Sequence, residues 1–177
     1  MALFTGKGDG GTTKLFGCDQ KRIAKSSEVP EALGALDELN AYLGFVKMHP
    51  KIPERISQGL REAQEALFII QAEVADSDKH TKEGVAEALG EIVNGIEKEI
   101  PPITGFSIAG GTELSAKLDV ARTIARRAER RVTAAELTGR TISPATKAYL
   151  NRLSSLLFAY ARLANHLAGV KEENPKY

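Results

Sequence analysis

The sequence contains a single cysteine, and it has no apolar run long enough to cross a membrane. One cysteine, Cys18, excludes an internal disulfide framework and is typical of a protein in the reducing cytosol. A membrane-spanning helix needs about 20 consecutive apolar residues. The amino-terminal stretch MALFTGKGDGG also lacks the apolar centre of a signal peptide. We therefore expect a soluble, cytoplasmic protein with no membrane partner.

The chain also lacks an excess of either charge. Its 24 Lys and Arg residues balance 23 Asp and Glu residues, which gives a net charge of +1. A nucleic-acid-binding domain is usually strongly basic, so the composition argues against that class of partner. The 42% apolar and 27% charged residues are ordinary for a globular protein. At 177 residues, the chain is long enough for one domain with a sizeable core and too short for two.

The residues that usually bind metals form no recognisable motif. A structural zinc site needs a cluster of cysteines and histidines, and none is present. Di-iron bundles carry Glu three residues before a ligating His, a spacing that His49, His80 and His166 all lack. We therefore expect no resident metal.

Alternation typical of strands is absent as well, and helical periodicity begins at Ser26. Apolar residues three or four positions apart predict five helices, which are capped or ended by Ser, Thr, Pro and Gly residues. They would run from Ser26 or Ser27 through Val46, from about Pro53 to Val74, from about Thr81 to Ile100, from the cap Thr112 to about Leu137, and from the cap Ser143, followed by Pro144, to Gly169. Short connections predict an all-α, antiparallel five-helix bundle over residues 26–170, with a frayed tail at 171–177.

Glycine is concentrated near the amino terminus. The stretch TGKGDGGTT, residues 5–13, holds four glycines and cannot form a stable helix, which predicts a mobile loop over residues 1–25. Backbone amides freed by glycine, interleaved with Thr and Lys, suit a polyphosphate. The spacing GxxxxGK[ST] of the Walker A motif is not met. Taken alone, the stretch is more typical of a disordered tail.

Positive charge gathers in ARTIARRAERR, residues 121–131, which holds five arginines. At 100° per residue, the apolar positions of this helix fall on one arc. They are Leu114, Ala121, Ile124, Ala125, Ala128, Val132 and Ala135. The opposite face carries Arg122, Arg126 and Arg130 in one row, with Asp119 and Thr133 among them.

Two interpretations of the arginine row stay open on the helix alone. It could be a solvated face or a set of salt bridges between subunits. It could also be an anion site, since guanidinium groups offer forked donors that match phosphate oxygens. The glycine-rich loop favours the second interpretation, because the two features together suit a nucleoside triphosphate.

Two further polar residues interrupt apolar helical stretches. Asp37 lies within LGALDELN and is either an exposed acid or an interfacial one that needs a partner, for which an arginine of the row is the natural choice. Asn151 lies within YLNRLSSLLF and could contact a base or a phosphate oxygen, or be a surface amide.

Four stretches together resemble the PduO-type ATP:corrinoid adenosyltransferases over nearly the whole chain. They are TGKGDGGTT, ALGALDELNAYLG, FSIAGG with the following VARTIARRAERRV, and YLNRLSSLLF, in the order found in that family. The resemblance implies a five-helix bundle assembled as a homotrimer, with active sites between neighbouring subunits. It also implies transfer of the 5′-deoxyadenosyl group of ATP to the cobalt of cob(I)alamin, which gives adenosylcobalamin and triphosphate.

The resemblance divides the implied site residues between the two ends of the chain. One half of the ATP site would be formed by Thr5, Gly6, Lys7, Gly8, Thr13, Lys14 and Lys25. The other half would be formed by Arg126, Arg127, Glu129, Arg130 and Asn151. Asp37 and Arg122 would form a salt bridge across the subunit boundary, and Phe106 and Phe158 would line the lower face of the corrinoid. Catalysis would then depend on Asp37, Arg122 and Arg126.

The sequence departs from the family pattern at three places. The loop reads Thr5-Gly6-Lys7-Gly8-Asp9 where the family usually has Thr-Lys-x-Gly-Asp, so the lysine is shifted by one position. Ala109 replaces the usual proline before the double glycine, and Asp119 stands where His is common. The shift of the lysine bears on the phosphate contact expected of Lys7, while neither Ala109 nor Asp119 removes a group that the chemistry requires.

The resemblance also implies partners and leaves an alternative. Mg²⁺ would accompany ATP, while a cobalamin reductase and an adenosylcobalamin-dependent enzyme would be the expected protein partners. The alternative is a non-catalytic sensor or carrier that binds ATP or a corrinoid on the same bundle. The presence of Phe106 and of the pair Asp37 and Arg122 favours the enzyme.

Overall fold

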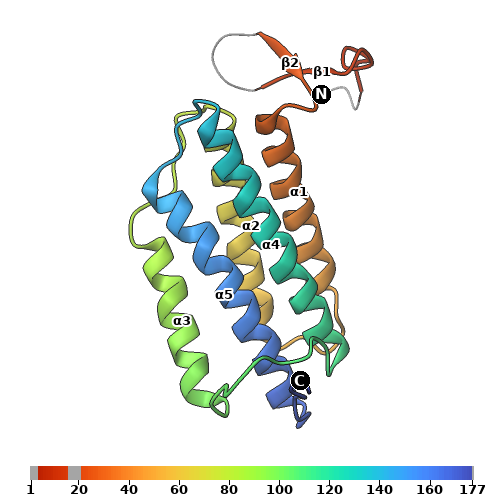
Figure 1. The fold of residues 1–177 in the computed structure, drawn as a ribbon, viewed down its shortest axis with the longest axis vertical. Coiled ribbons are helices and arrows are strands. Elements are labelled where there is room, and N and C mark those ends of the chain that lie inside the picture. The colour runs from red at the N-terminus through yellow and green to blue at the C-terminus, as the bar shows by residue number, and fades with distance from the viewer. Residues whose placement is uncertain (1–3, 16–20, 177) are drawn as a thin grey trace.

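The computed structural model describes residues 4–15 and 21–176, so Cys18 lies outside the described residues (Figure 1). Successive helices run in opposite directions in this part of the chain, which confirms the predicted five-helix bundle. The helices are α1 (Glu28–Lys47), α2 (Glu54–Val74), α3 (Val85–Glu99), α4 (Glu113–Leu137) and α5 (Pro144–Leu167).

Helix α4 lies at the centre of the packing, between α1 and α5. Helix α3 packs on the far side of α5, and α2 packs on α1. All seven apolar positions predicted for one arc of α4 are buried. Leucines such as Leu36, Leu118 and Leu153 are fully buried between these helices. Each stabilises the fold by about 1.5–3 kcal/mol relative to an exposed side chain.

Two of the predicted helix caps are confirmed. The hydroxyl of Thr112 accepts a hydrogen bond from the Ser115 amide at 3.1 Å, and that of Ser143 accepts one from the Thr146 amide at 3.2 Å. Ser27 also precedes a helix, but its hydroxyl donates to the Ala24 carbonyl instead.

Helix α3 begins at Val85, later than the predicted start at Thr81. Two features of the structure account for the difference. Gly84 has a left-handed conformation with φ of +83°, which no helix continues. The Thr81 amide donates to the carboxylate of Glu73 on α2, so it is held outside the helix.

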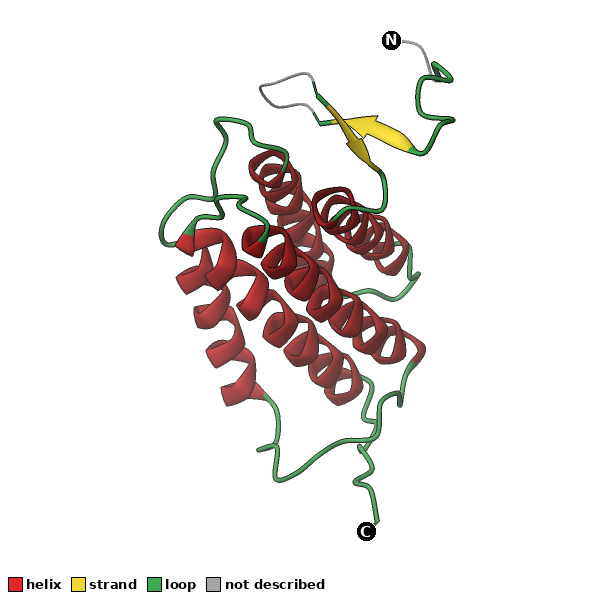
Figure 2. Cartoon of the chain, turned by 45° about the horizontal axis from the view of Figure 1, so that its top comes forward, coloured by secondary structure: helices red, strands yellow, loops and turns green. Residues whose placement is uncertain are grey.

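The prediction that the chain has no strand is wrong. Strands β1 (Thr12–Lys14) and β2 (Arg22–Ala24) form an antiparallel pair in which Thr13 faces Ile23. Three residues are too few to show alternation in the sequence. The pairing is reinforced by the Arg22 guanidinium, which donates to the Thr12 carbonyl at 2.6 Å and to the Lys7 carbonyl. Figure 2 shows this hairpin standing off the end of the bundle where α1 begins.

The prediction of a frayed tail is also wrong for residues 172–174, which hydrogen-bond to the rest of the chain. This tail lies against the connection between α3 and α4, where the Ile108 amide donates to the Glu173 carbonyl at 2.8 Å. Figure 1 shows the connection crossing the end of the bundle beside the carboxyl terminus. Within the described ranges, the structure contains no helix long and apolar enough to span a membrane.

Candidate functional site

The glycine-rich loop is a series of tight turns. The Asp9 amide donates to the Gly6 carbonyl at 3.2 Å, and the Gly11 amide donates to the Gly8 carbonyl at 3.1 Å. Gly6 and Gly11 have φ of +66° and +74°, conformations that side chains other than glycine rarely adopt. The loop therefore needs glycine at these two positions to turn, and it leaves Thr5 exposed.

The hairpin brings Lys25 back to the glycine-rich loop. Its backbone amide donates to the Gly11 carbonyl at 2.9 Å. Its Nζ lies so close to Gly8 that a Cβ there would be 3.1 Å away. Thr13, Lys14 and Lys25 then line a pocket between the hairpin, α1 and α2. The structure thus brings together residues that the family resemblance assigns to one half-site.

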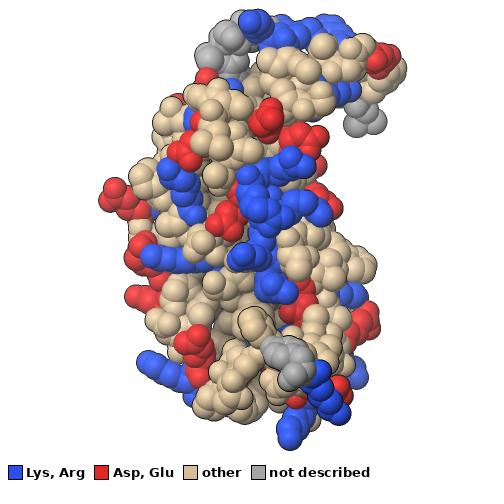
Figure 3. Space-filling model, in the orientation of Figure 1, with Lys and Arg blue, Asp and Glu red and all other residues tan. Residues whose placement is uncertain are grey.

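The arginines of α4 gather over the middle of one face, as Figure 3 shows. Arg127 pairs with Glu38, and Arg131 lies 3.9 Å from Glu31, so acids of α1 neutralise both. Arg126 and Arg130 are exposed, and no carboxylate of the described residues lies within ion-pair distance of either. Two guanidinium groups one turn apart repel each other. This arrangement favours an anion between them.

Two other predicted residues meet beside the arginine row. The side-chain amide of Asn151 on α5 donates to the Glu129 carboxylate on α4 at 3.1 Å. This hydrogen bond fixes the orientation of both side chains next to Arg126 and Arg130, on the same face of the bundle.

Phe158 lies on the other side of the row, in a second pocket. This pocket is lined by Arg122, Arg126 and Phe158, together with Ile103 from the connection between α3 and α4. The guanidinium carbon of Arg122 is 5.9 Å from the centre of the Phe158 ring, within the range of a cation–π interaction. One pocket is therefore lined by both an apolar wall and two cations.

Within a single chain, Asp37 and Arg122 do not lie next to each other. Asp37 is exposed on α1 and lines the pocket of the hairpin. Arg122 lines the pocket of Phe158, and its Nε faces Asp119 at 3.7 Å. The two predicted halves of the site therefore lie at separate pockets of the same chain.

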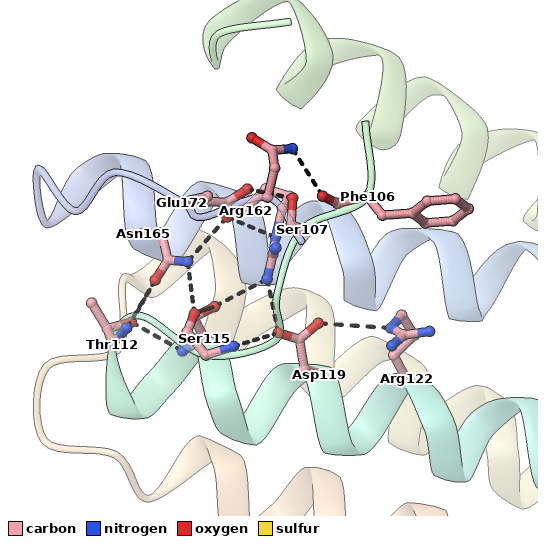
Figure 4. A network of polar contacts seen from close by, with 11 residues as sticks. Phe106, Ser107, Thr112, Ser115, Asp119, Arg122, Arg162, Asn165 and Glu172 are labelled. Atoms are coloured by element: carbon pink, nitrogen blue, oxygen red, sulfur yellow. Dashed lines mark hydrogen bonds and ion pairs between the residues drawn. The ribbon is translucent and has the colours of Figure 1, made fainter. Parts of the chain in front are cut away.

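Phe106 lies in the connection between α3 and α4, and its side chain is 78% exposed. Figure 4 shows the ring directed away from a network of polar contacts, while its carbonyl faces that network. The Asn174 side chain donates to this carbonyl at 2.9 Å. An exposed aromatic ring on a connection fixed through its backbone is suited to contacting a ligand.

The polar network in Figure 4 was not predicted. Asp119, expected on the polar face of its helix, is 5% exposed, because Arg162 reaches it from α5 with Nη2 at 2.8 Å. Asn165 and Glu172 complete the network around Arg162. A signal was present in LLFAYARLAN, where Arg162 and Asn165 interrupt an apolar stretch, since buried arginines are rare unless they are paired.

Among the described residues, no three His, Cys, Asp or Glu side chains are placed to hold one metal ion.

The family model described as "Cobalamin adenosyltransferase" matches residues 3–164. Among curated proteins, the chain is 36% identical to the corrinoid adenosyltransferase PduO of Citrobacter freundii, covering 94% of this chain and 50% of that protein. It is 34% identical to a cobalamin adenosyltransferase of Cupriavidus metallidurans, covering 94% of this chain and 90% of the relative. The chain thus spans half the length of the first relative and nearly all of the second.

Solved structures of the same kind of protein are similar to this chain in fold. The fold is similar to a variant PduO-type ATP:corrinoid adenosyltransferase from Lactobacillus reuteri complexed with cobalamin and ATP, with a TM-score of 0.90 and 30% identity over 99% of this chain and all of the other. A second variant from the same organism, complexed with ATP, has a TM-score of 0.89 and 31% identity over 98% of this chain and all of the other.

Proposed function

The chain belongs to the cobalamin adenosyltransferase family, and we propose that it transfers the 5′-deoxyadenosyl group of ATP to the cobalt of cob(I)alamin. The observation that carries this proposal is the pair Arg126 and Arg130, which is exposed and lacks a carboxylate partner in the described residues, with Phe158 in the adjoining pocket. Cations beside an apolar wall suit a site that binds a triphosphate next to a large, flat ligand.

The reaction forms a bond between cobalt and C5′ and breaks the bond between C5′ and the triphosphate oxygen. Cobalt(I) supplies the electron pair, so no side chain has to act as a general base. The tasks of the protein are to hold C5′ in line with cobalt and to stabilise the charge that develops on the triphosphate. Arg126 and Arg130 fulfil the second task from α4, together with Lys7, Lys14 and Lys25 from the hairpin segment.

ATP binds between two copies of the chain in a homotrimer. Support comes from the two separate pockets, one beside the hairpin with Asp37 and one beside Arg122. A neighbouring copy would bring its arginine row to this hairpin, and Arg122 would then meet Asp37 across the boundary. Thr5, Gly6, Gly8 and Thr13 would cradle the phosphates from one side, while Arg127, Glu129 and Asn151 would complete the nucleotide site from the other.

Phe106 and Phe158 form the wall against the lower face of the corrinoid. An apolar ring at that position excludes water and the cofactor's own base from the lower axial position of cobalt. The four-coordinate cobalt(II) that results is easier to reduce to cobalt(I). The exposed ring of Phe106 on the connection between α3 and α4 supports this assignment.

The remaining components follow from the substrates. Mg²⁺ enters with ATP and is bound mainly by phosphate oxygens. A cobalamin reductase in the cytoplasm supplies the electron that converts cobalt(II) to cobalt(I), and an adenosylcobalamin-dependent enzyme receives the product.

Anaerobic turnover tests the proposal directly. The protein is mixed with ATP, Mg²⁺ and chemically reduced cobalamin, and we expect the light-sensitive spectrum of adenosylcobalamin together with one triphosphate per product. Arg126→Ala should lower kcat by about 10²-fold or more, as removal of a transition-state donor does. Arg131→Ala is the matched control, because Arg131 lies on the same helix and pairs with Glu31. Binding of both substrates without product would identify a sensor or carrier instead.

A further inference from the structure

The carboxyl-terminal tail is bound to the connection that carries Phe106 at three consecutive residues. The Phe106 carbonyl accepts from the Asn174 side chain at 2.9 Å, and the Ile108 amide donates to the Glu173 carbonyl at 2.8 Å. Between them, the Ser107 hydroxyl donates to the Glu172 carboxylate at 3.1 Å. The chain from the carbonyl of Phe106 to Ile108 is therefore held by residues 172–174.

Arg162 connects this tail to the interior of the bundle. Its side chain is 2% exposed, and its Nε lies 2.9 Å from Glu172. Its Nη2 donates to Asp119 at 2.8 Å and to the Ser115 hydroxyl at 3.3 Å. A buried guanidinium between two carboxylates is a stable arrangement only while both acids remain in place. The tail thus depends on Arg162, and Arg162 depends on the tail.

The same arginine contacts the second aromatic wall. The guanidinium carbon of Arg162 lies 5.0 Å from the centre of the Phe158 ring. Asp119, which receives Arg162 on one oxygen, faces Arg122 with the other at 3.7 Å. One buried side chain is therefore linked to Phe158 directly, to Phe106 through the tail and to Arg122 through Asp119, as Figure 4 shows for the polar part.

The double glycine after the connection is fixed by the same network. The Gly110 amide donates to Asp119, and the Gly110 carbonyl accepts from Asn165 and from Ser115. Gly111 has φ of +100°, and a Cβ there would lie 2.6 Å from the Asn165 side chain. The connection is thus fixed again at Gly110, further along on the carboxyl-terminal side of Phe106, and the Phe106 ring stays exposed.

We propose that Arg162, Glu172 and Asn174 are positioning residues. They hold Phe106 and Phe158 at fixed positions relative to each other, as the two walls of the corrinoid site. We call residues 172–174 the tail clamp. This proposal rests on the function proposed above and adds to it residues that need not touch either substrate. If the clamp is released, the Phe106 ring no longer stays over the lower axial position, while the ATP half-sites on the hairpin and α4 are unaffected.

The first experiment needs no substrate. Hydrogen exchange at the Ile108 amide reports on the clamp, because that amide is bonded to the tail. In Asn174→Ala and Glu172→Gln we expect exchange at Ile108 to become roughly tenfold faster or more, as for a locally opened segment. Glu173→Ala is the matched control, since Glu173 binds Ile108 through its carbonyl and its own side chain is exposed. Unchanged exchange in both clamp variants would overturn the proposal.

The second experiment separates positioning from stability. The four-coordinate fraction of enzyme-bound cob(II)alamin is measured by electron paramagnetic resonance, alongside ATP affinity and the melting temperature. We expect Asn174→Ala and Phe106→Ala to lower this fraction in the same way. The Kd for ATP should stay within about twofold, since no ATP contact is lost. Turnover should fall when it starts from bound cob(II)alamin and much less when it starts from free cob(I)alamin.

The outcomes distinguish the two proposals. A clamp variant that keeps the wild-type four-coordinate fraction while Phe106→Ala loses it would overturn the positioning role and leave the proposed function intact. A wild-type protein that binds no corrinoid would overturn the proposed function and the positioning role with it. Arg162→Lys serves as a further variant, because it keeps the positive charge but loses the forked N–H donors of the guanidinium group. If it folds, its four-coordinate fraction should resemble that of Asn174→Ala.

Discussion

At the scale of single residues, Glu73 shows how one buried carboxylate joins three segments. It is 2% exposed at the end of α2 and accepts from the Thr146 hydroxyl at 2.8 Å, the Thr81 amide at 3.3 Å and the Ser143 amide. Burial raises its pKa, but the hydrogen bonds from Ser143, Thr146 and Thr81 together lower it more, so the pKa lies below its ordinary value of 4.5. An ionised carboxylate at the start of α5 also suits the positive end of that helix.

Glu73→Gln tests this assignment through its dependence on pH. At pH 7 the substitution should lower the free energy of unfolding by about 1–3 kcal/mol, because an amide satisfies fewer of the three donors. The folded-state pKa is lower than the unfolded-state value near 4.5, so the stabilisation is fully present above that value. It is lost as the pH falls through the folded-state pKa. Urea unfolding of both proteins at pH 7 and in acid measures the difference.

Glu65→Gln is the control for Glu73→Gln, because Glu65 lies on the same helix but is exposed and pairs with Arg61 one turn away. Its effect should stay within about 0.5 kcal/mol at either pH. A destabilisation by Glu73→Gln that is the same at every pH would contradict a role for the ionised carboxylate.

At the scale of elements, the helices could be predicted and the contacts between distant segments could not. Apolar spacing and the caps Thr112 and Ser143 are local signals, and the structure agrees with them. Strand pairing depends on Arg22, whose side chain reaches Thr12 ten positions earlier. The late start of α3 and the packed tail depend on Glu73 and on Arg162. Each of these contacts joins residues far apart in sequence, so no local pattern predicts it.

The hairpin segment should become more ordered when ATP binds. Its glycine content makes ordering costly, at about 1–2 kcal/mol per residue, and contacts to phosphate would offset that cost. Hydrogen exchange over residues 5–15 and 21–25 should therefore slow markedly when ATP is added. The amides of α3 (Val85–Glu99) are the internal control, because that helix packs on α5, away from the hairpin. Equal exchange of the hairpin segment with and without ATP would contradict an ATP site there.

At the scale of the whole molecule, the distribution of charge supports the proposed assembly of several copies. The chain is almost neutral, yet among the described residues Arg126 and Arg130 of α4, and Asp37 of α1 beside the hairpin, have no ion-pair partner. Ion pairs within the chain already neutralise Arg127 and Arg131. What one copy leaves exposed on α4 is therefore complementary to what another copy leaves exposed on α1. Site residues from both ends of the sequence can then meet without any rearrangement of the bundle.

A double-mutant cycle on Asp37 and Arg122 tests this assembly. If the two residues meet at a buried boundary, Asp37→Asn and Arg122→Ala should each weaken the trimer by about 3–5 kcal/mol, because each leaves the other charge without its partner. The double variant should cost far less than the sum of the two, since neither charge then remains. Sedimentation equilibrium gives the association free energies. Arg131→Ala should leave them unchanged, because its partner Glu31 belongs to the same chain. Additive effects of Asp37→Asn and Arg122→Ala would show that Arg122 serves only Asp119 within its own subunit, and the boundary would have to be sought on another face.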